Sequence, residues 1–142
     1  MKKGNTLVEV IVSLAIILMA LTIVSQIIIM STKALNKRKV KEEAERIAYA
    51  IENEAKYNNN FRDLGEELTF RYSKDILNIL IQEPLTALER GDDIILKRIN
   101  DITKEDSEDK TLIYKYSIKV KDDNGGVLAE REFIKSYWME KK

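Results

Sequence analysis

One carboxylate stands at the edge of a long apolar stretch and is the residue best suited to a chemical role. Glu9 is followed by a run from Val10 to Met30 that contains no charged residue. An ionised carboxylate at the edge of such a run is costly to bury unless a positive charge lies close to it. Glu9 is therefore a candidate functional residue. The alternative is that it lies at the level of lipid headgroups and has no role.

The apolar run has the length of a membrane span. Between Val10 and Met30 the only polar residues are Ser13, Thr22, Ser25 and Gln26. At a rise of about 1.5 Å per residue, a helix over this run is about 31 Å long, which is the thickness of the hydrocarbon layer. The sequence predicts a transmembrane helix here.

The residues before the span form a short sequence motif at a fixed distance from the apolar run. Lys2-Lys3-Gly4 is followed by Thr6-Leu7-Val8-Glu9 and then by the apolar run. This arrangement resembles the class III signal of type IV pilins and of the pilin-like proteins of type II secretion and competence systems. The resemblance covers residues 1 to about 30.

The resemblance implies a role for each motif residue. Lys2 and Lys3 are the basic part of a leader whose last residue is Gly4, and a prepilin peptidase cuts between Gly4 and Asn5 on the cytoplasmic side. Asn5 becomes the first mature residue and is N-methylated. Glu9 pairs with the positive amino terminus, its own or a neighbour's, as subunits enter a filament.

The resemblance also implies partners and a location. The partners are the peptidase, other pilin subunits, an inner-membrane assembly platform and membrane lipid. The precursor is a single-pass protein of the cytoplasmic membrane and the product an extracytoplasmic filament at the cell surface. Most of the family has phenylalanine in place of Asn5, and many major pilins have a helix-melting proline in place of Gln26. Both departures favour a minor pilin or a pseudopilin over a major subunit.

Composition excludes several classes of site. The chain has no cysteine and no histidine, so a disulfide framework is excluded and zinc or Ser-His chemistry lacks its usual ligands and bases. We predict no enzyme activity, no metal site and no cofactor. The 24 basic residues equal the 24 acidic ones, which gives no support for nucleic-acid binding through net charge.

The helix is expected to continue well beyond the span. Apolar residues recur at spacings of three and four, which predicts one amphipathic stripe. No glycine or proline occurs between Asn5 and Tyr57, so we expect one helix of about 53 residues, about 80 Å long. The stripe consists of Val40, Ala44, Ile47, Ala48, Ile51 and Ala55.

A basic cluster just after the span has three interpretations. It suits contact with anionic headgroups, at about 1 kcal/mol per basic residue. It also suits phosphate contact in a competence pseudopilin that touches DNA, a contact that the basic strand face with Lys115, Lys119 and Lys121 could make instead. By the positive-inside rule it would place the C-terminal part in the cytoplasm as an anchored interaction domain, the reverse of what the resemblance implies. The cluster is Lys33, Lys37, Arg38, Lys39 and Lys41.

The remaining residues predict a small β-rich domain. Asn58–Asn60 end the helix, and a short strand follows over Leu68–Tyr72. Ser73 caps a helix that is interrupted at Pro84 and resumes to Arg90, although a buried strand over Ile76–Ile81 fits the same apolar run. A strand over Asp92–Ile102 precedes an acidic loop, Lys104–Lys110.

The clearest β signal lies near the C-terminus. Apolar residues alternate with mostly basic ones over 112–121, residues Asp122–Gly126 form a hairpin with Asn-Gly supplying positive φ, and Val127–Trp138 returns antiparallel. The apolar face is Leu112, Tyr114, Tyr116, Ile118 and Val120, and the other face is Ile113, Lys115, Ser117, Lys119 and Lys121.

These elements together predict an α+β, pilin-like fold. The outer half of a long N-terminal helix packs on an antiparallel β-meander, because neither is stable alone in water. The expected segments are the leader 1–4, the transmembrane and polymerisation helix 5–32, the amphipathic helix 33–57 and the globular domain 58–142.

Three further clusters have a structural interpretation beside a functional one. Asp122, Asp123 and Asn124 fit a calcium loop less well than an ordinary turn. The acidic residues 105–109 fit a solvated connection. Phe133, Tyr137 and Trp138 fit a partner-binding patch or, more often for such residues, core packing against the helix.

Overall fold

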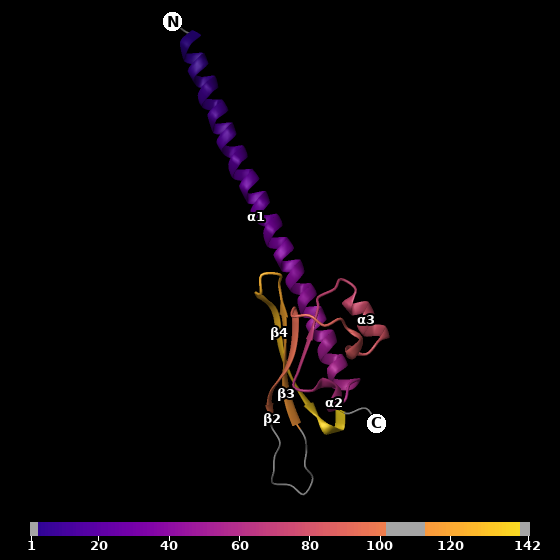
Figure 1. Cartoon of the computed structure of the whole chain (residues 1–142). Helices are drawn as coiled ribbons and strands as arrows, with labels where there is room; N and C mark the ends of the chain where they lie inside the picture. Colours follow the sequence, from indigo (N-terminus) through magenta and orange to yellow (C-terminus); the bar gives the residue numbers. More distant parts are fainter. Residues whose placement is uncertain (1–2, 102–112, 140–142) are drawn as a thin grey trace. The chain divides into compact units, whose positions relative to one another are not determined.

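The computed structural model describes residues 3–101 and 113–139, and it divides into two compact units. The first unit ends at Lys39 and the second begins at Val40. One helix, α1 (Lys3–Tyr57), forms the described part of the first unit and contributes its last turns to the second (Figure 1).

Helix α1 confirms the prediction of one uninterrupted helix. It begins two residues before the predicted start and ends at Tyr57, as expected from the asparagines that follow. The Asn58 amide and the Asn59 side-chain amide both donate to the carbonyl oxygen of Glu54, each at 3.0 Å. These bonds satisfy a carbonyl that has no partner further along the helix.

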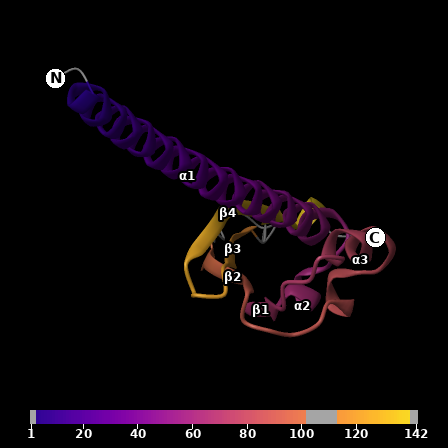
Figure 2. The ribbon, with the colours of Figure 1, turned by 90° about the horizontal axis from the view of Figure 1, so that it is seen from above.

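Four strands form the predicted meander. Strands β1 (Glu67–Phe70), β2 (Ile94–Asp101), β3 (Ile113–Lys121) and β4 (Val127–Ser136) lie in the order β1-β2-β3-β4, and every neighbouring pair is antiparallel (Figure 2). The alternation of apolar and polar residues over 112–121 therefore predicted a real strand, although Leu112 lies outside the described residues.

The β3–β4 turn differs in one detail from the expected hairpin. Positive φ occurs only at Gly125, at 79°, and not at Asn124. The Asp122 carboxylate instead shapes the turn, because it accepts hydrogen bonds from the backbone amides of Asn124 (3.0 Å) and Gly126 (2.6 Å). A register shift beside the turn accommodates the extra residue.

The connection from β1 to β2 is helical, so the alternative of a buried strand over Ile76–Ile81 is wrong. Helix α3 (Ile76–Gln82) begins after Asp75 rather than at Ser73, whose hydroxyl accepts from the Asp75 amide at 3.2 Å. After Pro84 only a short 3₁₀ helix, η1 (Leu85–Ala87), forms, where a helix to Arg90 was expected.

Two other short helices depart from the expected strands and loops. Helix α2 (Phe61–Leu64) follows the asparagines and was not predicted. The last strand ends at Ser136 rather than Trp138, and the 3₁₀ helix η2 (Tyr137–Met139) follows it.

The core lies between the last turns of α1 and one face of the sheet. Five of the six stripe residues are buried, and they meet a sheet face whose largest buried side chain is Tyr116. The Tyr116 ring stacks on Phe133 at 5.4 Å between centroids. Val40 is the exception, with 46% of its surface exposed. The buried stripe residues are Ala44, Ile47, Ala48, Ile51 and Ala55.

Polar contacts also join α1 to the sheet and its loops. The Glu52 carboxylate is buried and receives hydrogen bonds from Lys56 of α1 and from Arg131 Nε of β4, the latter at 2.7 Å. Burial and a hydrogen bond to Glu43 raise the pKa of Tyr72, just after β1, to about 12. These pairs fix the rotation of the helix on the sheet.

Lys135 makes the most buried of these contacts. Its side chain is fully buried, and Nζ donates to the carbonyl oxygens of Ala55 (2.8 Å), Lys56 (2.8 Å) and Asn59 (2.6 Å). An ammonium group has three N–H donors, so all of them are used. The Lys135 side chain thus caps the C-terminal end of α1, although it is about 80 residues away in the sequence.

Candidate processing and assembly site

The predicted cleavage residues lie at the start of α1. The backbone of Lys3, Gly4 and Asn5 is helical, and Lys2 lies outside the described residues. Gly4 and Asn5 therefore stand in the first turn, directly ahead of the apolar part of the helix. The assignment of Gly4 and Asn5 as the cleavage site, and of Asn5 as the methylated residue, stays a prediction.

Glu9 lies on the exposed surface of α1, one turn after Asn5. It shares a shallow hollow along the helix with Thr6, Val10, Ser13, Leu14 and Ile17. The Ser13 hydroxyl donates to the Glu9 backbone carbonyl at 2.7 Å and leaves the carboxylate alone. Among the described residues nothing pairs with this carboxylate. It is available to a positive group from outside the described part of the chain.

The apolar side chains in the first half of α1 have no cover in the described part of the chain. From Leu7 to Met30 they are exposed on every side of the helix, and the least exposed of the large ones is Val12 at 51%. Over the residues from Thr6 on, α1 is long and apolar enough to cross a membrane by length and composition. The physical consequence is that this half of the helix needs lipid or other helices around it.

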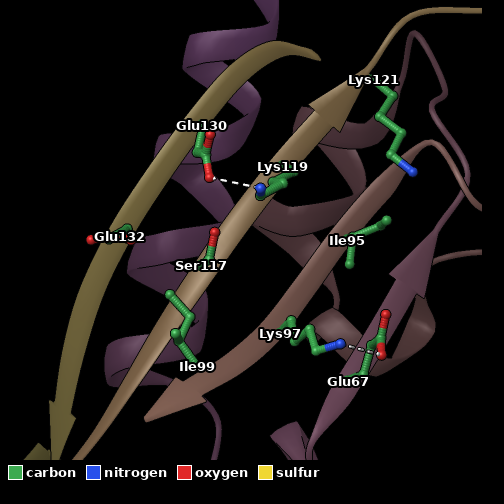
Figure 3. A pocket seen from close by; sticks show the side chains of 9 residues that line it. All are labelled: Glu67, Ile95, Lys97, Ile99, Ser117, Lys119, Lys121, Glu130 and Glu132. Carbon is green, nitrogen blue, oxygen red and sulfur yellow. Dashed lines mark ion pairs between the residues drawn. The ribbon is translucent and has the colours of Figure 1, made fainter. Parts of the chain in front are cut away.

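The outer face of the sheet, turned away from α1, carries both lysines and glutamates. It forms a groove of about 500 Å³ with Ile95, Ile99 and Ser117 along its floor (Figure 3). The lysines come from the two central strands and the glutamates from the two edge strands: Lys119 Nζ lies 3.0 Å from Glu130, and Lys97 Nζ lies 3.6 Å from Glu67. Lys115 pairs with Glu132 in the same way.

This pairing bears on the expected DNA contact. Of the three lysines expected to touch phosphates, Lys115 and Lys119 have a carboxylate partner, and only Lys121 has none among the described residues. The charges of Lys115 and Lys119 are neutralised within the sheet, so the face offers little net attraction to a phosphate backbone. The basic residues from Lys33 to Lys41 are exposed on α1.

Of the other clusters, Asp122 belongs to a turn and Phe133 to the core. Asp122 accepts backbone hydrogen bonds in its turn, as the turn interpretation expected. Within residues 3–101 and 113–139 no group of three or more acidic side chains is placed to hold a metal ion. Phe133 is core, whereas Trp138 is 66% exposed. The acidic loop lies outside the described residues.

Sequence reasoning missed the residues that hold the helix on the sheet. Glu52, Arg131 and Lys135 received no role, although a signal was present. In β4, Ala129, Arg131, Phe133 and Lys135 alternate on one face, and the apolar members of that set mark it as the inner face. Basic residues at inner positions point to partners on the helix.

Comparison with known proteins gives one family match. Residues 1–25 match the prokaryotic N-terminal methylation motif. No curated protein and no solved structure matches the chain. Proteins with this motif are structural rather than catalytic. The match supports the interpretation that the chain is a pilin-like prepilin, which is processed by a peptidase and assembles with other pilins. The chain therefore joins the N-terminal methylation motif of type IV pilin-like proteins to a pilin-like α+β architecture.

Proposed function

We propose that this protein is a minor pilin or pseudopilin of a type IV pilus-like filament. The observation that carries the proposal is the methylation motif over residues 1–25, whose apolar helix continues without a break to Met30 and is covered by nothing in the described chain. A span of this kind serves first as a membrane anchor and then as the packing surface of a filament.

Cleavage between Gly4 and Asn5 creates the charge that Glu9 needs. The new amino terminus lies four residues before Glu9, about 6 Å along a helix, so the two groups lie on the same side. At 4 Å and an effective dielectric constant of about 20, such a pair gains about 4 kcal/mol. A neighbour's amino terminus at the same depth offers the same attraction, which fixes the stagger between subunits.

The location and partners follow from this role. The precursor is held in the cytoplasmic membrane with Lys2 and Lys3 on the peptidase side, and Asn5 is N-methylated after cleavage. The mature chain passes from lipid into the filament at an inner-membrane assembly platform. Residues 40–142 then lie outside the membrane. The paired lysines of the sheet weigh against a DNA-contacting role for its outer face.

Replacing Gly4 with valine is expected to abolish processing. A peptidase must approach the backbone on both sides of the bond it cuts, and a β-branched side chain at Gly4 obstructs that approach. The test is the gel mobility of the chain expressed with its peptidase. Asn5→Phe, which places the family's usual residue after the same glycine, is the matched control and should still be cut. Equal mobility of the Gly4→Val and native chains would contradict the leader assignment.

Replacing Glu9 with alanine is expected to leave membrane insertion intact and to reduce incorporation into filaments at least tenfold. The reason is the loss of the attraction to an amino terminus, about 4 kcal/mol. Losing about 1.4 kcal/mol, a third of that attraction, already lowers an equilibrium constant tenfold. Immunoelectron microscopy of sheared filaments measures incorporation. Ser13→Ala, on the same hollow, is the control and should assemble normally. Native-level incorporation of Glu9→Ala would remove Glu9 from the mechanism.

A further inference from the structure

The polar side chains of the span divide into those that are satisfied by the helix itself and those that are not. Ser13, Thr22 and Ser25 each donate to a backbone carbonyl three or four residues earlier, at 2.7, 2.7 and 2.8 Å. Between Leu7 and Met30, where every residue is described, Glu9 and Gln26 are the only polar residues whose side chains have no hydrogen-bond partner. Glu9 has a proposed role, and Gln26 does not.

The Gln26 amide requires hydrogen bonds that a single helix in lipid does not supply. It carries two donors and a carbonyl oxygen with two acceptor sites. It is exposed on α1 and lies four residues before Met30, about 6 Å inside the end of the apolar run. An amide without partners in hydrocarbon is costly, and in membranes the usual solution is a polar group on a neighbouring helix.

Gln26 and Glu9 face different neighbours. The two residues are seventeen positions apart, which is about 26 Å along the helix axis. At about 100° per residue, they point in directions about 100° apart around the axis. A helix that packs against Glu9 therefore does not reach Gln26. The amide marks a second contact face, on which Met19, Thr22 and Ile29 recur at spacings of three and four.

We propose that Gln26 forms a hydrogen-bonded pair with Gln26 of a second copy of this chain, across two parallel spans. An amide is both donor and acceptor, so it is complementary to itself. Copies inserted in the same orientation carry Gln26 at the same depth, which brings the two amides together without a shift along the axis. The inference rests on the proposed function, since it names the second subunit contact of the assembling helix.

Disulfide trapping tests this pair, because the native chain has no cysteine. The full chain with Met30→Cys is placed in phosphatidylcholine vesicles and oxidised with copper phenanthroline. Met30 lies on the Gln26 face, about 40° away, whereas Ile28 lies about 160° away and serves as the matched control. We expect a covalent dimer with Met30→Cys and little with Ile28→Cys.

A second substitution tests the amide itself. Gln26→Met keeps the unbranched shape and removes the hydrogen bonds, so it is expected to reduce the Met30→Cys dimer about three- to twentyfold. Gln26→Asn keeps an amide and should retain most of the dimer. If Gln26→Met leaves the yield of the Met30→Cys dimer unchanged, the role of Gln26 is overturned.

The remaining outcomes separate this inference from the proposed function. Absence of a dimer in vesicles that hold this chain alone, or equal trapping at Ile28, overturns the pairing of two copies. Processing at Gly4 is scored in parallel, in cells that express the same variants with the peptidase. A chain that is cut and inserted but not trapped leaves the proposed function intact, whereas a chain that is neither cut nor inserted contradicts both.

Discussion

Replacing Lys135 with methionine is expected to lower the free energy of unfolding of the unit formed by residues 40–142 by about 4 kcal/mol. Methionine fills a similar volume but donates no hydrogen bond. Three carbonyl oxygens at the end of α1 then lose their shared donor, and each buried unsatisfied group costs about 1–3 kcal/mol. The negative end of the helix dipole also loses the cation beside it.

Chemical denaturation measures this effect. The full chain in mild detergent is unfolded with urea and followed by near-UV circular dichroism, which reports the packing of Tyr116. Lys119→Met is the matched control, because its ion pair with Glu130 is half exposed and contributes less than about 1 kcal/mol. A loss below about 1 kcal/mol for Lys135→Met would show that the three hydrogen bonds do not hold the end of the helix.

Replacing Glu52 with glutamine is expected to lower the same free energy by about 3 kcal/mol at pH 7. The Glu52 carboxylate is only 8% exposed and lies between Lys56 and Arg131, so the variant leaves two cations facing a neutral amide. Breaking a buried pair of this kind costs about 3–5 kcal/mol, and the partial exposure of Arg131 places the value at the lower end.

The same carboxylate should make stability depend on pH. Burial raises the pKa of Glu52, but the hydrogen bonds from Lys56 and Arg131 outweigh it and hold the pKa below its usual value of 4.5. The carboxylate therefore stabilises the fold above pH 4.5 and loses that contribution as the pH falls through its lower folded pKa. Native protein should weaken below pH 4.5, and Glu52→Gln should weaken less steeply.

Urea unfolding at a series of pH values checks both statements. Glu132→Gln is the control, because Glu132 is half exposed in its pair with Lys115 and its loss should change little at any pH. Parallel pH profiles for the native chain and Glu52→Gln would assign the acid sensitivity to other carboxylates.

Most of the architecture is predictable from local patterns. Helix α1 contains no glycine or proline from Asn5 to Tyr57, and the alternation in β3 leaves one choice of inner face. Short elements were less predictable: α2 and η2 have too few residues for a periodic signal, and the run from Ile76 fits a strand as well as a helix. Tertiary packing decided these segments.

The functional residues also differ in how far the sequence predicts them. The motif from Gly4 to Glu9 is recognisable because a processing signal is contiguous in the sequence, and its fixed distance from the span adds specificity. The helix–sheet contacts are not contiguous. Arg131 and Lys135 are polar residues in an alternating strand, and only the fold shows that their partners are Glu52 and the end of α1.

The contact between Lys135 and Ala55 also orders events during synthesis. The two residues are 80 positions apart, so at about 5–20 residues per second the ribosome adds the lysine roughly 4 to 16 s after the alanine. The apolar half of α1 precedes both and leaves the ribosome first. Translation thus presents the span to the membrane before the domain that follows it is able to close.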